Sequence, residues 1–490
     1  MPVYPATVAA GAASPLSGLG EAGEVVLPLA LMAQAVAEAG CPQRRRRLLP
    51  ALAVMVFVLG CCLFYGEGYR EVARKLAGWL APLAGPGGWR LPGSSALAKA
   101  RARLGAAPFE LLFARLAGPL ADAATPGAAA FGRLLLALDG TRLDVPFTPA
   151  NVAAFGPPPR GGGGAAGGLP QARVVTLAGC GTRGLADAAV GPRTGKGSSE
   201  QHLARQIARR GRLRRGMLVI GDRNFCGYPA AAALAGTGAD VLLRARSDQR
   251  FPVLEPLPDG SCRSVLADPD AARALIRRNA QRRRRGSRVP PDPRSALPGL
   301  AIRLIEADIT ITQDGQPPAT ERCRLITTLA DPAAAPAEAI AACYAQRWEI
   351  ENGYRETKVF TRGPGQVLRS RHPAGVTQEI WALLCACQLT HAARARAAQT
   401  GGHDPDRISY TITLRALRRA LITHSPSPAA DITAEALDDL LPAQRRRRRY
   451  PRLSSAKTAA RRRARTGLTG TVAYKITIVA PAQATDLPGP

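Results

Sequence analysis

The chain has 490 residues, of which 66 are Lys or Arg and 36 are Asp or Glu, so its formal net charge is +30. A hydrophobic content of 46% excludes a wholly disordered protein, and ten cysteines spread over this length exclude a small disulfide scaffold. The length predicts two to four domains, and the charge indicates a polyanionic partner, most often nucleic acid. Only six basic residues are Lys, a skew that a coding bias would also produce, so charge alone indicates no chemistry.

The first 125 residues are predicted to form a disordered segment followed by a small helical domain. Residues 1–29 carry no basic leader of the secretory type, and we expect them to be disordered. Residues 48–65 are an uncharged run of 18 residues, at the lower edge of the length that spans a bilayer. Because Pro50 and Gly60 lie within this run and no second run follows, a buried core helix is favoured over a membrane helix. The helical domain is expected over residues 30–125, with helices at 48–65, 71–80 and 94–120.

From residue 133 onward, short apolar runs predict a mixed α/β region. Its predicted strands are residues 134–138, 173–177, 185–190, 217–220 and 241–246, with a helix over about 199–210. The next segment, 247–330, is interpreted as strand-rich and irregular, with strands at 301–312 and 323–329 and a strongly basic stretch at 273–288. Two strong helices are predicted over 337–360 and 374–396. The region 401–490 is basic, and its segment 445–465 contains eleven basic residues and no acid.

Two acids follow predicted buried strands. Asp139 comes directly after the run 134–138, and Asp222 closely follows the run 217–220. Polar ligands commonly bind at such strand ends in α/β sheets. A third acid must come from another element, and the helix after residue 337 offers Glu349, Glu351 and Glu356.

Helix geometry chooses among these three glutamates. At about 100° per residue, one face about 60° wide carries Glu351 together with Tyr344, Arg347 and Lys358. Glu349 and Glu356 point to the opposite side. Glu351 is therefore the carboxylate that shares a face with an aromatic ring and two cations.

This face suits phosphodiester chemistry. Carboxylates from separate elements can hold two divalent metal ions that bracket an in-line phosphoryl transfer. Arg347 and Lys358 would bind backbone phosphates beside the metals, and Tyr344 would stack on or hydrogen-bond to a distorted strand end. The alternative is a solvated helix that carries only an ion pair between Arg347 and Glu351, four residues apart.

The spacing Tyr344-x2-Arg347-x3-Glu351-x6-Lys358 resembles the Tyr-Arg-Glu-Lys signature of bacterial insertion-sequence DDE transposases of the insertion sequence 4 type. Other blocks resemble this family in the same order along the chain. They are the N-terminal helices at 44–60 and 96–105, the first-acid block LALDGTRLDVPFTPANVAAFG at 136–156, the second-acid blocks at 199–204 and 216–228, and the helix at 367–391. The resemblance covers roughly residues 25–450.

The resemblance implies an α/β fold with a ribonuclease-H-like catalytic core and a β-rich insertion, preceded by a small helical N-terminal domain that would bind DNA. The core would comprise residues 130–246 and 331–400, and the insertion would be residues 247–330. The region 401–490 would form a basic C-terminal region.

The resemblance also implies roles for six residues. Asp139, Asp222 and Glu351 would be the catalytic triad and would bind two Mg²⁺ ions, with Mn²⁺ as a substitute. The residues that contact transposon-end DNA near the scissile phosphate would be Tyr344, Arg347 and Lys358.

The implied activity is to cut double-stranded DNA at the terminal inverted repeats of an insertion sequence and to join the 3′ ends to target DNA. The protein would act as a homodimer or larger complex on the nucleoid in the bacterial cytoplasm, without a membrane partner. No nucleotide cofactor is expected, because residues 191–199 depart from a phosphate loop: Gly197 follows the Lys. A non-catalytic, sequence-specific DNA-binding relative is the alternative. The Gly-rich stretch 160–168 and the Arg-rich stretch 273–288 depart from the family pattern.

Overall fold

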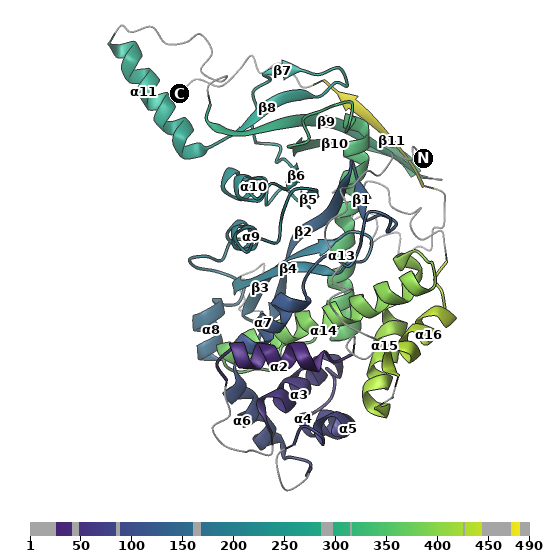
Figure 1. The fold of residues 1–490 in the computed structure, drawn as a ribbon. Coiled ribbons are helices and arrows are strands. Elements are labelled where there is room, and N and C mark those ends of the chain that lie inside the picture. Colours follow the sequence, from purple (N-terminus) through teal and green to yellow (C-terminus); the bar gives the residue numbers. More distant parts are fainter. Residues whose placement is uncertain are drawn as a thin grey trace.

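The computed structural model describes residues 26–41, 49–84, 89–159, 168–285, 297–313, 316–424, 427–442 and 472–480. At its centre lies a mixed sheet of 11 strands in the order β4-β3-β2-β5-β6-β10-β9-β8-β7, with β1 added at β2 and β11 added at β9 (Figure 1). The strands are β1 (Ala129–Ala130), β2 (Arg133–Asp144), β3 (Gln171–Gly179), β4 (Leu185–Pro192), β5 (Met217–Gly221), β6 (Asp240–Arg244), β7 (Glu255–Pro256), β8 (Cys262–Ala267), β9 (Gly299–Gln313), β10 (Gln316–Thr327) and β11 (Val472–Val479).

The N-terminal helices lie together at one end of the molecule, whereas α11 projects from the other end (Figure 1). The α-helices are α2 (Leu29–Glu38), α3 (Ala51–Leu63), α4 (Tyr69–Lys75), α5 (Ala77–Leu80), α6 (Ser94–Leu104), α7 (Ala107–Leu116), α8 (Pro149–Phe155), α9 (Glu200–Arg209), α10 (Tyr228–Ala235), α11 (Pro269–Arg284), α12 (Ala337–Cys343), α13 (Trp348–Arg355), α14 (Pro373–Thr400), α15 (Tyr410–Thr423) and α16 (Pro428–Asp438).

The N-terminal helical region packs around α3. Every residue of α3 from Ala53 to Leu63 is buried, and the helix contacts α6 and α14. This confirms the core helix expected within residues 48–65. In the described part of the chain, no helix has the length and apolarity needed to cross a membrane. The helix predicted over 94–120 is divided into α6 and α7, because Gly105 adopts a positive φ of 73° between them.

Strands β4-β3-β2-β5-β6 form the middle of the sheet. β2 pairs antiparallel with β3 and parallel with β5, and β5 pairs parallel with β6. Alternate residues of β2 enter separate hydrophobic clusters: Leu136 and Leu138 pack with α9 and α10, whereas Leu135 and Ala137 pack with α14. Burial on both faces explains the uninterrupted apolar run of this strand. This mixed five-stranded order is the ribonuclease-H-like core that the resemblance implied.

Strand β2 is longer than predicted and does not end at Asp139. Its parallel pairing with β5 stops at Leu138, but its antiparallel pairing with β3 continues to Asp144. Backbone hydrogen bonds to β3 therefore carry the strand into a polar segment that its apolar pattern does not mark. Asp139 lies inside β2, at the point where β5 leaves it.

Strands β7 to β10 extend the sheet beyond β6, as expected of a strand-rich segment at 247–330. β10 pairs with β6 and β9, while β8 and β11 occupy successive halves of the other edge of β9. The basic stretch of this segment was not predicted as a helix, but most of it forms α11, which starts at the N-cap residue Asp268. β11 also lies where no element was predicted.

Some predicted segments lie outside the described residues. They are residues 1–25, most of the Gly-rich stretch 160–168 and the basic segment 445–465. The described chain begins with Val26 and Leu27, which are buried and belong to the main hydrophobic cluster.

Candidate active site

Two predicted acids lie beside each other at the centre of the sheet, Asp139 within β2 and Asp222 directly after the end of β5. Leu138 of β2 pairs with Gly221 of β5, so Asp139 and Asp222 follow at the same level of two parallel strands. The Gly140 backbone N–H donates to Asp139 Oδ1 over 2.8 Å. The chain turns away after Asp222, where the Asn224 N–H donates to Asp222 Oδ1, also over 2.8 Å.

The signature segment is one continuous helical stretch whose winding changes twice. After α12, residues Tyr344–Arg347 form a 3₁₀ turn (η1), Trp348–Arg355 form α13, and Glu356–Thr361 form a π-helical turn (η2). The extent of the helix predicted over 337–360 is therefore confirmed. Its uniform rotation of about 100° per residue does not hold, because a 3₁₀ turn winds more tightly and a π turn more loosely than an α-helix.

Arg347 connects two of the predicted acids. Its Nη2 donates to Glu351 Oε1 over 2.9 Å, and its Nη1 lies 3.8 Å from Asp139 Oδ2. The ion pair that the alternative interpretation expected is thus present. It faces Asp139 instead of open solvent, since all three side chains are at most 24% exposed.

The environment of Asp139 disfavours its negative charge. Burial raises the pKa of this carboxyl to about 7, with further increases from Asp222 and Glu351, while Arg347 acts in the opposite direction. Carboxylate oxygens are the donors that Mg²⁺ prefers, and a cation beside these acids would stabilise their charged forms. In the described part of the chain, no three Asp, Glu, His or Cys side chains are gathered closely enough to hold a metal ion as they stand. The donor types suit Mg²⁺, but the Arg347 guanidinium contacts both Asp139 and Glu351 in this arrangement.

The two remaining signature residues are half-buried near these acids. Burial raises the pKa of the Tyr344 phenol, and Asp222 contributes to this increase. Burial lowers the pKa of the Lys358 ammonium, and Arg362 lowers it further, while Asp144 and Asp139 oppose the change. Lys358 therefore lies within electrostatic range of Asp139.

Sequence reasoning missed two residues that surround Asp139. The Tyr354 hydroxyl donates to the Asp139 backbone carbonyl over 2.5 Å and accepts from Thr176 Oγ1 over 2.8 Å. Glu200, the first residue of α9, reaches Asn224 with its carboxylate at 3.2 Å. Glu200 lies in the block 199–204 that resembles the family, but its place after the helix N-cap Ser199 indicated only the start of a helix.

We expect Gly140→Ala to reduce DNA cleavage by about 10²-fold. A Cβ at this position would lie 2.5 Å from the Glu200 carboxylate carbon, so the Glu200 carboxylate must move and its contact with Asn224 is disturbed. Displacements of about 1 Å can have this effect on a catalytic group. Cleavage rates and melting temperatures should be compared with those of Gly66→Ala, because a Cβ on Gly66 meets no atom within 4 Å. Equal cleavage by both variants would contradict the prediction.

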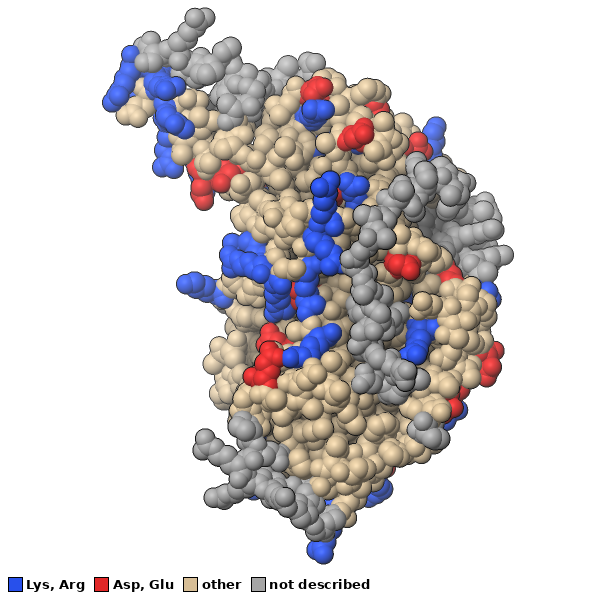
Figure 2. Space-filling model, viewed as in Figure 1, with Lys and Arg blue, Asp and Glu red and all other residues tan. Residues whose placement is uncertain are grey.

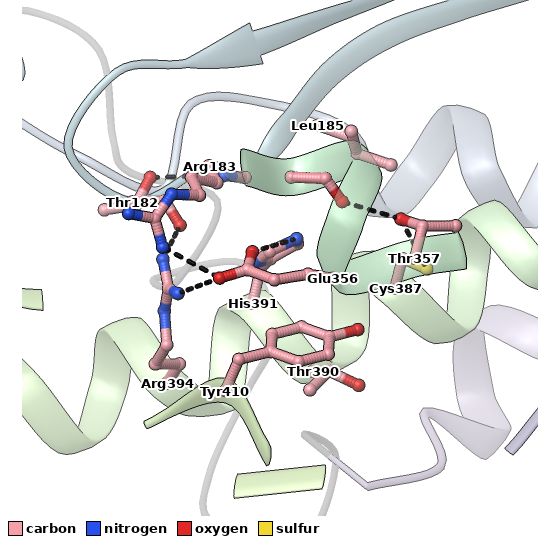
Figure 3. A network of polar contacts seen from close by, with 12 residues as sticks. Thr182, Arg183, Leu185, Glu356, Thr357, Cys387, Thr390, His391, Arg394 and Tyr410 are labelled. Carbon is pink, nitrogen blue, oxygen red and sulfur yellow. Dashed lines mark hydrogen bonds and ion pairs between the residues drawn. The ribbon is translucent and has the colours of Figure 1, made fainter. Parts of the chain in front are cut away.

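Glu349 and Glu356 point away from the acids, as the helical projection predicted, and join a buried ionic network (Figure 3). Arg183 lies in the turn between β3 and β4, and its Nε is 3.2 Å from Glu349 Oε2. Its Nη1 donates to Glu356 Oε1 over 2.8 Å, and its Nη2 donates to Asp406 Oδ1 over 2.7 Å. Arg394 of α14 also donates to Glu356, over 3.1 Å. This network attaches the signature helix to the sheet and to α14.

Acidification is expected to destabilise the fold through His391, which lies beside Glu356 in this network. Burial lowers the pKa of His391 to about 3, whereas the unfolded ring titrates near 6.5. Below about pH 6.5 the unfolded state therefore binds more protons, and stability falls as the pH drops from 6.5 towards 3. Between pH 7 and pH 5, the melting temperature of His391→Gln should fall less steeply than that of wild type or of the exposed-site variant His372→Gln. Parallel curves for all three proteins would contradict this assignment.

Comparisons with known proteins agree with the order of the motifs along the chain. Residues 20–114 match the family model of the insertion element 4 transposase N-terminal region, and residues 130–389 match that of the transposase DDE domain. The transposase InsG for insertion sequence element IS4, from Escherichia coli strain K12, is 28% identical over 413 residues, covering 84% of each chain. A cryo-EM structure of a piggyBac transposase synaptic complex with hairpin DNA gives a TM-score of 0.40 at 11% identity, covering 89% of this chain and 83% of that one.

The DDE-domain match alone spans more than half of the chain, and the N-terminal match precedes it in the order typical of insertion element 4 transposases. The chain therefore belongs to the insertion element 4 family of DDE transposases.

Proposed function

We propose that this DNA transposase cuts double-stranded DNA at the terminal inverted repeats of an insertion sequence and joins the 3′ ends to target DNA. Asp139, Asp222 and Glu351 would be its catalytic triad and hold two Mg²⁺ ions. The observation that carries this proposal is the register of β2 and β5, which sets two aspartates side by side, together with the Arg347 contacts that link Asp139 to Glu351.

The roles of the surrounding residues follow from these contacts. Bound divalent metal would supply Lewis acidity to the attacking and leaving oxygens of an in-line displacement. The Arg347 guanidinium would exchange its carboxylate partners for a phosphate group, since both groups can accept two parallel N–H bonds from the planar fork of arginine. Lys358 would contact a neighbouring phosphate, and the half-buried Tyr344 would contact the DNA end. Tyr354 and Thr176 would hold the Asp139 backbone in place through their hydrogen bonds.

The reaction needs no nucleotide cofactor. In the first step a water molecule attacks the phosphate at the element end and the 3′-oxygen leaves as a hydroxyl. In the second step a 3′-hydroxyl attacks another phosphodiester, so one phosphodiester bond forms as one breaks. We further propose that the N-terminal helices contribute to DNA binding and that the protein acts as a homodimer or larger complex on DNA.

Removal of metal tests this proposal directly. Purified protein should nick a duplex carrying the flanks of its own gene at a discrete position in Mg²⁺ or Mn²⁺, and it should not cut in EDTA. DNA binding in both conditions, measured by fluorescence anisotropy, serves as the control for folded protein. Binding without cutting under any metal would overturn the proposal in favour of a non-catalytic DNA-binding relative.

A further inference from the structure

Helix α11 is an arm that leaves the sheet between two paired strands (Figure 1). Ala267 of β8 pairs with Gly299 of β9, and the Asp268 N–H donates to the Pro298 carbonyl over 2.8 Å. The chain therefore leaves and re-enters the sheet at neighbouring positions. The helix has 16 residues and none of them is buried. At about 1.5 Å per residue, it is about 24 Å long.

The charged residues of α11 are almost all cationic. The helix carries one acid, Asp270, and six arginines: Arg273, Arg277, Arg278, Arg282, Arg283 and Arg284. Arg273 pairs with Asp270 over 2.6 Å, and none of the other five forms an ion pair with a described residue. Figure 2 shows basic side chains gathered at the upper left, where Figure 1 places α11.

Folding gives no reason for this composition. A helix of about this length is marginal in water unless it buries an apolar face, and α11 buries no residue. Its arginines also repel one another at four-residue spacing, as Arg273 and Arg277 do and Arg278 and Arg282 do. A polyanion that neutralises these charges would remove the repulsion and release its own counterions.

The strand order gives the distance between this arm and the acids. Five strand spacings separate β2, which carries Asp139, from β8, where the arm begins. At about 4.8 Å per spacing this is about 24 Å, or roughly 7 base pairs of duplex at about 3.4 Å each. The arm itself is long enough to follow a similar length of DNA.

We propose that α11 binds the phosphate backbone of duplex DNA roughly 7–14 base pairs from the scissile phosphate. This rests on the proposed function, because it takes the DNA to be cut at Asp139, Asp222 and Glu351. The arm adds affinity that does not depend on base sequence, since arginines that contact only phosphates read no base edges.

The test replaces Arg277, Arg278, Arg282 and Arg283 with Gln, and a matched variant replaces the same four with Lys. Affinity is measured against salt concentration on duplexes that extend about 20 base pairs from the cut on both sides, or are shortened to about 5 base pairs on either side or on both sides. On long DNA the Gln variant should reduce the slope of log K against log salt by about 3–4, at about 0.9 per phosphate, while the Lys variant retains it. Shortening the DNA on one of the two sides should abolish the difference in salt slope between the Gln variant and wild type. That side contains the DNA segment that the arm contacts.

A third variant replaces residues 269–297 with Asn-Gly, a two-residue turn suited to joining antiparallel strands. It should melt like wild type, because no buried residue is removed from α11, and it should bind long DNA like the Gln variant. The proposal would be overturned if the Gln variant had the wild-type salt slope on long DNA. It would also be overturned if the Gln variant reduced the slope equally on long DNA and on DNA that is short on both sides. Cleavage of DNA that is short on both sides distinguishes the two proposals. If only the proposal for α11 is wrong, wild type and the Gln variant both cut this DNA at the same rate. If the proposed function is wrong, wild type itself does not cut.

Discussion

Replacing Arg183 with methionine is expected to lower the free energy of unfolding by about 3–5 kcal/mol. The Arg183 guanidinium pairs with Glu349, Glu356 and Asp406, and the four side chains are all at most 11% exposed. Its loss leaves three buried carboxylates with Arg394 as the remaining cation beside Glu356. Unfolding in guanidinium chloride, followed by tryptophan fluorescence and by circular dichroism, measures the change.

The matched control for this prediction is Arg322→Met on β10. Arg322 also pairs with acids, Asp308 and Glu306, but its side chain is 48% exposed. Exposed pairs contribute about 0–1 kcal/mol, so this variant should stay close to wild type. Equal stability of Arg183→Met and Arg322→Met would contradict the prediction and show that the network does not hold the signature helix.

The second large effect is expected from Glu351→Gln and Asp139→Asn, each of which should reduce metal-dependent cleavage by at least about 10²-fold. Each substitution removes a charged oxygen donor of the proposed metal site, and a loss of several kcal/mol in transition-state stabilisation corresponds to a factor of this size. Rates should be measured under single-turnover conditions on DNA carrying the gene's own flanks. DNA affinity should stay within a few-fold of wild type, since neither variant removes a cation.

Glu338→Gln is the control for this pair, because Glu338 is an exposed acid on α12, the helix that precedes the signature turn. It should cut at the wild-type rate. Wild-type cutting by Glu351→Gln would show that Glu351 is not the third acid. In that case Glu200, which contacts Asn224 beside Asp222, becomes the carboxylate to replace next.

The sequence was most informative where burial and periodicity agree. The apolar runs predicted β2 to β6 because strands buried on both faces need apolar residues at successive positions. The same reasoning set Glu349 and Glu356 opposite Glu351, and the structure confirms this because two buried arginines hold them there. It failed at the far end of β2, where backbone pairing with β3 continues through polar residues.

Long-range contacts and exposed helices were beyond the sequence patterns. The ion pair between Arg183 and Glu356 joins residues 173 positions apart, and no local pattern predicts such a partner. Helix α11 is rich in arginine and buries no residue, so core packing left no strong signal for a helix in its sequence. The 3₁₀ and π turns on either side of α13 likewise depend on packing, so they altered the projection of Lys358 without leaving a mark in the sequence.

The pairing of β11 with β9 has a consequence for biosynthesis. β11 covers β9 from Glu306 to Gln313, yet about 160 residues separate Gln313 from Val472 along the chain. At about 5–20 residues per second, a ribosome needs on the order of 10–30 s to make that stretch. During this interval the nascent chain presents half of an open strand edge to its neighbours, and such edges pair readily with other chains. Crowded translation of this protein should therefore favour aggregation before the last strand emerges and closes the edge.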